Sequence, residues 1–162
     1  MDHNVKADGK LATNNPTKLY SKAVGDTFSI FIALPPEYDS KDNTKYLAIL
    51  LLDANLYFDI FAVTLNKYAE VGMLPRAILV GIGCKDFREM DSFRSRDYTY
   101  PTAIAAYEMS VSGKADKFLS FINSELVPDI DLKYLIDKNN RLAGAFLGRI
   151  LYYLRTSSKP IS

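Results

Sequence analysis

The chain has 162 residues, of which 48% are hydrophobic and 24% are charged, and its formal net charge is +1. Such a chain is long enough to bury a substantial core, and its composition is that of one soluble globular domain. No block of basic residues indicates a nucleic-acid partner, and a near-neutral charge argues against electrostatic attachment to a membrane. The longest apolar run, residues 47–52, is far too short to span a bilayer.

The few histidine and cysteine residues exclude several kinds of site. Cys84 is the only cysteine, so the chain has neither an internal disulfide nor a cysteine-based zinc site. His3 is the only histidine, and it lies in a terminal segment of a kind that usually frays. We therefore expect no metal and no cofactor. The first residues are polar and contain no apolar signal region, so we expect a cytoplasmic protein.

The first half of the chain begins with a polar stretch and continues with two apolar runs. Residues 1–17 are rich in Asn, Lys, Asp and Thr, which predicts a flexible lead-in, and residues 18–162 are expected to form a single domain. Residues 28–34 are rich in β-forming side chains and predict a strand that ends at two prolines. Residues 46–52 are continuously apolar, which is typical of a strand buried on both faces in a parallel sheet.

The next segments alternate between helical and strand patterns. Apolar residues at helical spacing predict a helix over 56–71, and residues 77–82 predict a third strand. Residues 84–112 then form a long connection, and connections of this length are usually functional. A second amphipathic helix is expected over 114–126, ended by Pro128.

The last part of the chain predicts a short strand and a final helix. A polar turn is expected at residues 137–140, a strand at 142–143 and a helix over 147–154. Strands that alternate with helices in this way indicate an α/β domain with a mainly parallel sheet and flanking helices.

A Gly-x-x-x-Gly segment follows the last strand. It runs from Gly144 to Gly148 and is followed by apolar residues at helical spacing. This is the frame of a nucleophile elbow, the tight strand-to-helix turn whose usual form is Gly-x-Ser-x-Gly. The central position is occupied by Phe146, and a phenyl ring cannot attack a carbonyl carbon. The frame of a serine hydrolase is therefore present without its nucleophile.

Several segments carry a resemblance to one family through their order and spacing over residues 20–144. They read FIALPPEY (31–38), LLDANLYF (51–58), LPRAILVGIG (74–83), RSRDYTYP (94–101), GKADKFLSFI (113–122) and ELVP (125–128). Together they resemble the esterase-D and siderophore (enterochelin-type) esterases, which belong to the α/β-hydrolases.

The resemblance implies hydrolysis of a carboxylic ester by a serine nucleophile, with the oxyanion held by two backbone N–H groups. By position, these donors would be Asn55 and Leu147. The chain departs from the family at Phe146, and it ends before the strands that would carry the triad acid and histidine. The resemblance thus implies an incomplete, truncated α/β-hydrolase fold that lacks its catalytic residues.

One event could explain both departures. Codons for Ala-Phe-Leu-Gly-Arg at residues 145–149 can be chosen so that reading one base later gives His-Ser-Leu-Gly-Gly, the elbow of the family. We therefore expect residues from about 145 to 162 to be the product of a reading-frame change (a frameshift).

Other candidate residues each have a structural alternative. Arg94 and Arg96 could bind an anionic substrate, or they could organise the long connection through an ion pair with Asp97. Asp53 could be one of two paired carboxylates, or a strand-end residue that bonds the following backbone. Cys84 could be a nucleophile, but with no positioned base it is better explained as a small buried residue.

The sequence therefore indicates a member of a carboxylic-ester hydrolase family that is inactive as this chain. The alternative is a non-catalytic binding or assembly module that reuses half of the fold. A small-molecule ester is the expected ligand, with no nucleic-acid or membrane partner. We also expect a homodimer through the C-terminal strand or helix, because truncation would expose an apolar strand edge.

Overall fold

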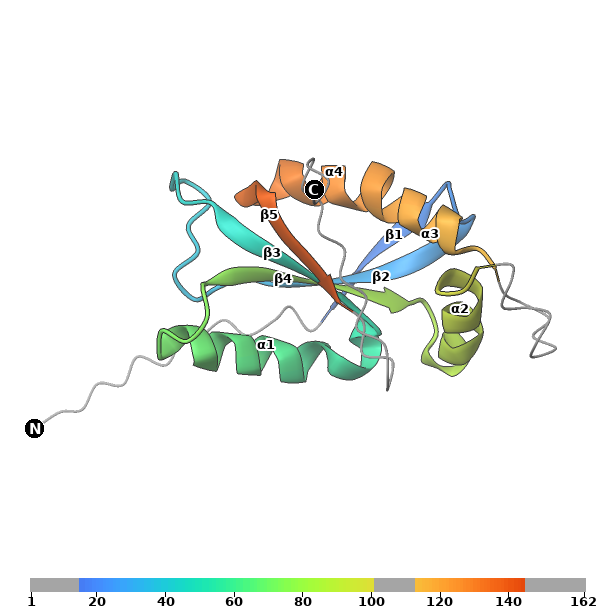
Figure 1. Ribbon diagram of the computed structural model, residues 1–162, viewed down its shortest axis with the longest axis horizontal. Coiled ribbons are helices and arrows are strands. Elements are labelled where there is room, and N and C mark those ends of the chain that lie inside the picture. The colour runs from blue at the N-terminus through green and yellow to red at the C-terminus, as the bar shows by residue number, and fades with distance from the viewer. Residues whose placement is uncertain (1–14, 101–112, 145–162) are drawn as a thin grey trace, which may run out of the picture.

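The computed structural model describes residues 15–100 and 113–144, which form one sheet with helices on both faces (Figure 1). The elements in chain order are β1 (Thr17–Ser21), β2 (Asp26–Ala33), β3 (Tyr46–Leu52), α1 (Ala54–Glu70), β4 (Ala77–Cys84), the 3-10 turn η1 (Phe87–Glu89), α2 (Met90–Asp97), α3 (Ala115–Phe121), the π-helical segment η3 (Ile122–Leu126), α4 (Val127–Lys133) and β5 (Ile136–Gly144).

The sheet is mixed, with the strand order β1-β2-β4-β3-β5. Strand β2 is antiparallel to both β1 and β4, whereas β3 is parallel to both β4 and β5. A mainly parallel sheet is therefore not confirmed by the described strands. A tight turn at Gly25, whose φ is 78°, joins β1 to β2 as a hairpin, and a short connection of this kind produces antiparallel neighbours.

Most of the strands and helices expected from the sequence are found. The strand at 46–52 has the predicted bounds, and the strands expected at 28–34 and 77–82 are β2 and β4. The helix expected over 56–71 is α1, which begins slightly earlier. Strand β1 was not expected, and neither was α2, which lies within the long connection.

The expected end of the second amphipathic helix at Leu126, before Pro128, is wrong. Helical structure continues through α3, η3 and α4 from Ala115 to Lys133. Pro128 lies in the first turn of α4, where a missing N–H costs little, and the π-helical turn before it lets α4 begin anew.

The polar turn expected at residues 137–140 is found as an irregularity inside β5. Tyr46 of β3 pairs with Ile136, but Ala48 pairs with Arg141, so β5 has extra residues between these two pairings. Asp137 accepts hydrogen bonds there from the backbone N–H of Asn139 and the side chain of Asn140. The expected strand at 142–143 is therefore the end of one longer strand.

The two faces of the sheet have cores of different size. On the face covered by α3 and α4, Phe28 stacks on Phe121 with ring centroids 4.4 Å apart. This larger core also contains Tyr46, Leu126, Ile130 and Ile136. On the opposite face, α1 lies below the sheet in Figure 1 and buries a smaller core made of Ala33, Leu51, Ala54, Phe58, Ala62 and Leu79. Among the described residues, no helix has the length and apolar character needed to cross a membrane.

We predict that Phe121→Ala lowers the free energy of unfolding by about 3–5 kcal/mol, because it removes a fully buried aromatic ring and leaves a cavity. Urea denaturation followed by circular dichroism measures this change. Leu132→Ala is the matched control, since Leu132 on α4 is 89% exposed and its truncation should change stability by no more than about 0.5 kcal/mol. Equal effects of the two substitutions would contradict the assignment of this core.

Candidate active site

The candidate site lies at the edge of the sheet where β3, β4 and β5 end. These strands are parallel neighbours, with Leu52 of β3 beside Ile82 of β4 and Leu51 beside Gly144 of β5. The segments that follow the three strands therefore begin close together. Ligands of α/β proteins commonly bind outside such carboxyl ends of strands.

Asp53 makes the turn from β3 into α1. Its φ of 55° lies in the left-handed region, which is uncommon for a residue other than glycine. Its carbonyl oxygen accepts hydrogen bonds from Leu56 N–H (3.0 Å) and Tyr57 N–H (3.3 Å), which start the helix. The N–H of Asn55 lies within the first turn, where backbone donors have no acceptor inside the helix. Its position makes it available to an external anion.

The side chain of Asn55 connects the start of α1 to the end of β4. Its Oδ1 accepts a hydrogen bond from the backbone N–H of Cys84 (2.8 Å), and its Nδ2 donates to the carbonyl oxygen of Cys84 (3.3 Å). The carboxamide thus binds both backbone groups of one residue on the neighbouring strand. This arrangement fixes the orientation of the first turn of α1.

Gly83 provides the space that Asn55 occupies. A Cβ atom at this position would lie 2.2 Å from Asn55 Oδ1 and 3.0 Å from the ring of Phe31. A side chain at Gly83 would therefore displace the Asn55 carboxamide from Cys84.

A buried acid lies behind this turn. The side chain of Asp53 is 2% exposed, and its Oδ1 lies 3.4 Å from both the Tyr98 hydroxyl and Arg94 Nε. Burial raises the pKa of Asp53, although the nearby Arg94 and Tyr98 partly oppose that effect. Burial, followed by the charge of Asp53, raises the pKa of Tyr98 well above its ordinary value, so its hydroxyl stays protonated and donates.

A small cavity lies between these groups and the end of β4. Its volume is about 20 Å³, enough for roughly one water molecule. It is lined by Asp53, Asn55, Cys84, Arg94 and Tyr98, among others. Asp53 Oδ2 and Arg94 Nε are buried and have no hydrogen-bond partner among residues 15–100 and 113–144, so polar atoms that can still bind a partner border the cavity.

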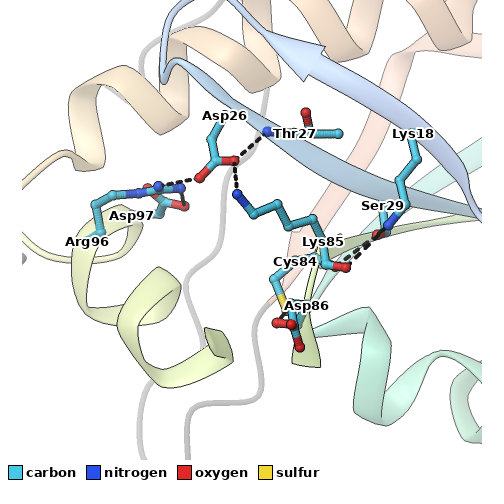
Figure 2. A network of polar contacts seen from close by, with 9 residues as sticks. All are labelled: Lys18, Asp26, Thr27, Ser29, Cys84, Lys85, Asp86, Arg96 and Asp97. Atoms are coloured by element: carbon cyan, nitrogen blue, oxygen red, sulfur yellow. Dashed lines mark hydrogen bonds and ion pairs between the residues drawn. The ribbon is translucent and has the colours of Figure 1, made fainter. Parts of the chain in front are cut away.

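Arg96 does not line this cavity and belongs to an ion network, shown in Figure 2. Its guanidinium binds Asp97 through two hydrogen bonds of 2.6 and 2.8 Å and Asp26 through one of 2.7 Å. The same guanidinium stacks on Phe93, 4.5 Å from the ring centroid. Lys85 completes the network, 3.3 Å from Asp26. The network attaches α2 to the β1–β2 hairpin.

The two acids of this network have opposite pKa shifts. Burial raises the pKa of Asp97 more than Arg96 lowers it. Burial also opposes ionisation of Asp26, but hydrogen bonds from Arg96, Thr27 N–H and Lys85 outweigh that effect and lower the pKa of Asp26. Asp26 is therefore the acid whose ionised form the fold stabilises.

Cys84 is buried, as expected from the sequence. Its thiol donates to the carbonyl oxygen of Asp86 (3.0 Å), and burial raises its pKa. A thiol held in its protonated form is a poor nucleophile. The structure gives Cys84 a packing role at the end of β4.

The structure brings together some of the residues singled out in the sequence. Asn55 and Arg94 lie at the same cavity, whereas Arg96 forms the expected pair with Asp97. Phe146 and Leu147, like His3, lie outside the described residues. Tyr98 and the side-chain role of Asn55 were not expected, although both residues belong to segments that carry the family resemblance. Within residues 15–100 and 113–144, no group of three or more His, Cys, Asp or Glu could hold a metal ion.

The described sheet and helices form part of a hydrolase fold of the esterase type. The model of the family described as Putative esterase matches residues 21–149. The chain therefore belongs to this esterase family.

Known proteins support the same assignment. The chain is 32% identical to the ferri-bacillibactin esterase BesA of Bacillus subtilis (strain 168), over 83% of this chain and 50% of that protein. It is similar to the crystal structure of BES protein from Bacillus cereus (26% identity, TM-score 0.68, 83% of this chain and 50% of that one). It is also similar to an IroE-like serine hydrolase from Shewanella oneidensis (27% identity, TM-score 0.64, 80% of this chain and 41% of that one). The chain thus spans about half the length of the curated relative it matches.

We predict that Asn55→Ala lowers the free energy of unfolding by about 1–3 kcal/mol, because it leaves the backbone N–H of Cys84 without its partner. Gly83→Ala should cost a similar amount, since the new methyl group displaces the same carboxamide. The loss in the double variant should be smaller than the sum of the two single losses, because alanine at 55 removes the carboxamide that the new methyl group would displace. Urea denaturation of the three variants measures this coupling, and additive losses would contradict it.

We further predict that Asp26→Asn lowers the free energy of unfolding by about 1–2 kcal/mol at pH 7, since it removes an acceptor of charged hydrogen bonds. The pKa of Asp26 is lowered from 3.8 in the folded state, so the stabilisation is present above about pH 3.8 and is lost as the pH falls through the lower folded value. The difference between the two proteins should therefore shrink below pH 4.

Urea titrations from pH 3 to pH 7 test this dependence. Asp59→Asn, the same substitution at an exposed position of α1, is the control. A difference between Asp26→Asn and the unmodified chain that stays constant over this range would contradict the prediction.

Proposed function

We propose that this chain is the oxyanion-binding half of a carboxylic-ester hydrolase of the siderophore-esterase type, and that this chain by itself does not hydrolyse esters. The observation that carries the proposal is the position of the Asn55 N–H. It lies in the first turn of α1, which follows β3, and β3 is the parallel neighbour of the strand that leads to Gly144.

The chemistry of ester hydrolysis explains why such a donor matters. Attack on the ester carbonyl turns the carbonyl oxygen into an oxyanion, and a backbone N–H that already points at this position stabilises the negative charge without reorganisation. The helix N-terminus adds a partial positive charge. The bonds from Asn55 to Cys84 hold this donor in place. Leu147 is the proposed second donor, by its position after Phe146 in the sequence.

The nucleophile and its base are the parts that this sequence does not supply. Phe146 occupies the position of the serine, and the only imidazole is that of His3. A serine hydroxyl requires an adjacent base to attack an ester at neutral pH. The proposed lack of activity follows from two features together: the serine position holds phenylalanine, and no base is positioned beside it.

The proposed substrate is the ester of an iron-binding siderophore, because the relative from Bacillus subtilis is a ferri-bacillibactin esterase. Arg94 is the better candidate for binding an anionic part of such a ligand, since its side chain is 25% exposed at the cavity. The guanidinium of Arg96 is already bound by Asp26 and Asp97. Arg96 is therefore proposed to contribute only through the shape of the connection.

A non-catalytic binding or assembly role is the second candidate. It is favoured by the large apolar side chains that α1 and the following turn expose, including Ile60 (65%), Val71 (68%) and Met73 (68%). Surfaces of this kind usually mark contacts between proteins. A homodimer through the C-terminal strand or helix is one form of this proposal.

We predict that the purified chain hydrolyses 4-nitrophenyl acetate at the rate of the buffer blank. Phe146→Ser should not restore activity, because no base is positioned to remove the hydroxyl proton. Initial rates with and without a serine-directed fluorophosphonate measure this. Turnover that survives repurification and is abolished by the reagent would overturn the proposal, whether it came from the unmodified chain or from the variant.

A further inference from the structure

The turn that carries the proposed oxyanion donor has an uncommon backbone conformation. Asp53 lies between β3 and α1 with a φ of 55°, and among the described residues it is the one residue other than glycine with a positive φ. A side chain in the left-handed region is strained, and such a conformation persists where the surrounding structure holds it. The course of the chain through Asn55 depends on this dihedral angle. A contact that holds Asp53 therefore also sets the direction of the Asn55 N–H.

Tyr98 reaches this turn from the end of α2. Its hydroxyl donates a hydrogen bond to Oδ1 of Asp53 (3.4 Å), although the two residues lie 45 positions apart in the sequence. The pKa of Tyr98 is raised well above its ordinary value by burial, so the hydroxyl stays protonated and can donate at neutral pH. The side chain of Asp53 is 2% exposed, so little water competes for its oxygen atoms.

The ring of Tyr98 is itself held by the larger core. It packs on Phe118 of α3, with ring centroids 5.4 Å apart, and Phe118 packs in turn on Phe28 and Phe121. The backbone N–H of Tyr98 donates to the carbonyl oxygen of Arg94 (3.0 Å) at the end of α2. A tyrosine whose ring and backbone are both held has few rotamers left. The core thus determines where the hydroxyl lies.

The turn between β3 and α1 is therefore held at two points. The carboxamide of Asn55 binds both backbone groups of Cys84, and Tyr98 binds the carboxylate two positions before Asn55. The first contact fixes the side chain of Asn55. The peptide plane that carries its N–H also follows the backbone of the preceding residues, and the second contact constrains those.

We propose that Tyr98 is a positioning residue for the Asn55 N–H, because its hydroxyl holds Asp53 in the left-handed conformation that directs this donor. The inference rests on the proposed function, since it concerns the donor assigned there. Arg94 is less suited to this role. Its Nε has no hydrogen-bond partner among the described residues, and its side chain is shared with Asp91, 3.7 Å away.

The test compares Tyr98→Phe with Tyr38→Phe in the full chain. Both substitutions remove one hydroxyl from a half-buried tyrosine and keep the ring. The Tyr38 hydroxyl accepts a hydrogen bond from Leu135 N–H (3.2 Å), and its ring packs on Tyr46 at the start of β3. Tyr38→Phe is therefore a matched control at the other end of the strand that leads to Asp53.

The probe is phenylphosphonate, whose tetrahedral group of charged oxygens resembles the oxyanion formed in ester hydrolysis. Its binding is followed by the ¹H and ¹⁵N chemical shifts of the Asn55 amide. We expect Tyr98→Phe to weaken this binding about fivefold, the effect of losing one hydrogen bond, and Tyr38→Phe to leave it unchanged. The residual dipolar coupling of the Asn55 N–H, measured without the anion, reports the direction of this bond and should change in Tyr98→Phe alone.

The outcomes separate the role of Tyr98 from the proposed function. If the Asn55 amide of the unmodified chain does not respond to phenylphosphonate, the proposed donor is wrong and the role of Tyr98 is overturned with it. If the amide responds equally in the unmodified chain and in Tyr98→Phe, the donor stands and the role of Tyr98 alone is overturned. An unchanged dipolar coupling in Tyr98→Phe, or equal effects of Tyr98→Phe and Tyr38→Phe, would overturn that role as well.

Discussion

The position of β3 between β4 and β5, parallel to both, is the constraint on which the candidate site depends. Because β3 runs parallel to both neighbours, the segments after these strands begin at one edge of the sheet. The left-handed turn at Asp53 then leads into α1, which packs on one face of the sheet while its first N–H groups stay at that edge. The Asn55 carboxamide links this turn to β4, and it can do so only because Gly83 has no side chain. One pairing pattern thus determines where the proposed oxyanion donor lies.

The charged residues of the long connection divide into two groups with different consequences. Arg96 is surrounded by Asp26 and Asp97 and lies over Phe93, so its charge is balanced within the fold. Arg94 Nε lies 3.4 Å from Oδ1 of the buried Asp53 and has no hydrogen-bond partner among the described residues. The Arg94 side chain is 25% exposed and also lies 3.7 Å from the exposed Asp91. Burial raises the pKa of Asp53, and the charge of Arg94 partly opposes that effect. Two arginines only two positions apart therefore have separate roles, one in holding α2 and one at the cavity.

The sequence predicted a strand or helix well where one property of the side chains, such as a continuous apolar run, dominated the segment. The run at 46–52 is continuously apolar because β3 is buried on both faces, and its bounds were predicted to the residue. β1 was missed because most of its side chains are exposed and polar, as at Thr17 and Lys18. Pro128 was misjudged because a π-helical turn, which has no recognisable sequence pattern, precedes it.

The candidate site was predictable only in part, because several of its contacts join residues that lie far apart in the sequence. The Asn55 N–H could be placed from its distance to the end of a strand, which is local information. The partners of its side chain lie 29 residues away, and Asp26 lies 70 residues from Arg96. Which residues meet across such separations depends on strand order, and the mixed order of this sheet was not evident from alternation alone. Tyr98 could have been suspected only as an aromatic residue in a charged segment of the family pattern.

The two faces of the sheet bury cores of different size, and this difference bears on the position of the proposed donor. On one face, α3, η3 and α4 bury a core that includes a fully enclosed Phe121. On the other, α1 buries a smaller core in which three of the six side chains are alanines. The Asn55 N–H, which we propose as the oxyanion donor, lies at the start of this same α1. Because this smaller core holds α1 against the sheet, packing on this face also determines the position of the proposed donor.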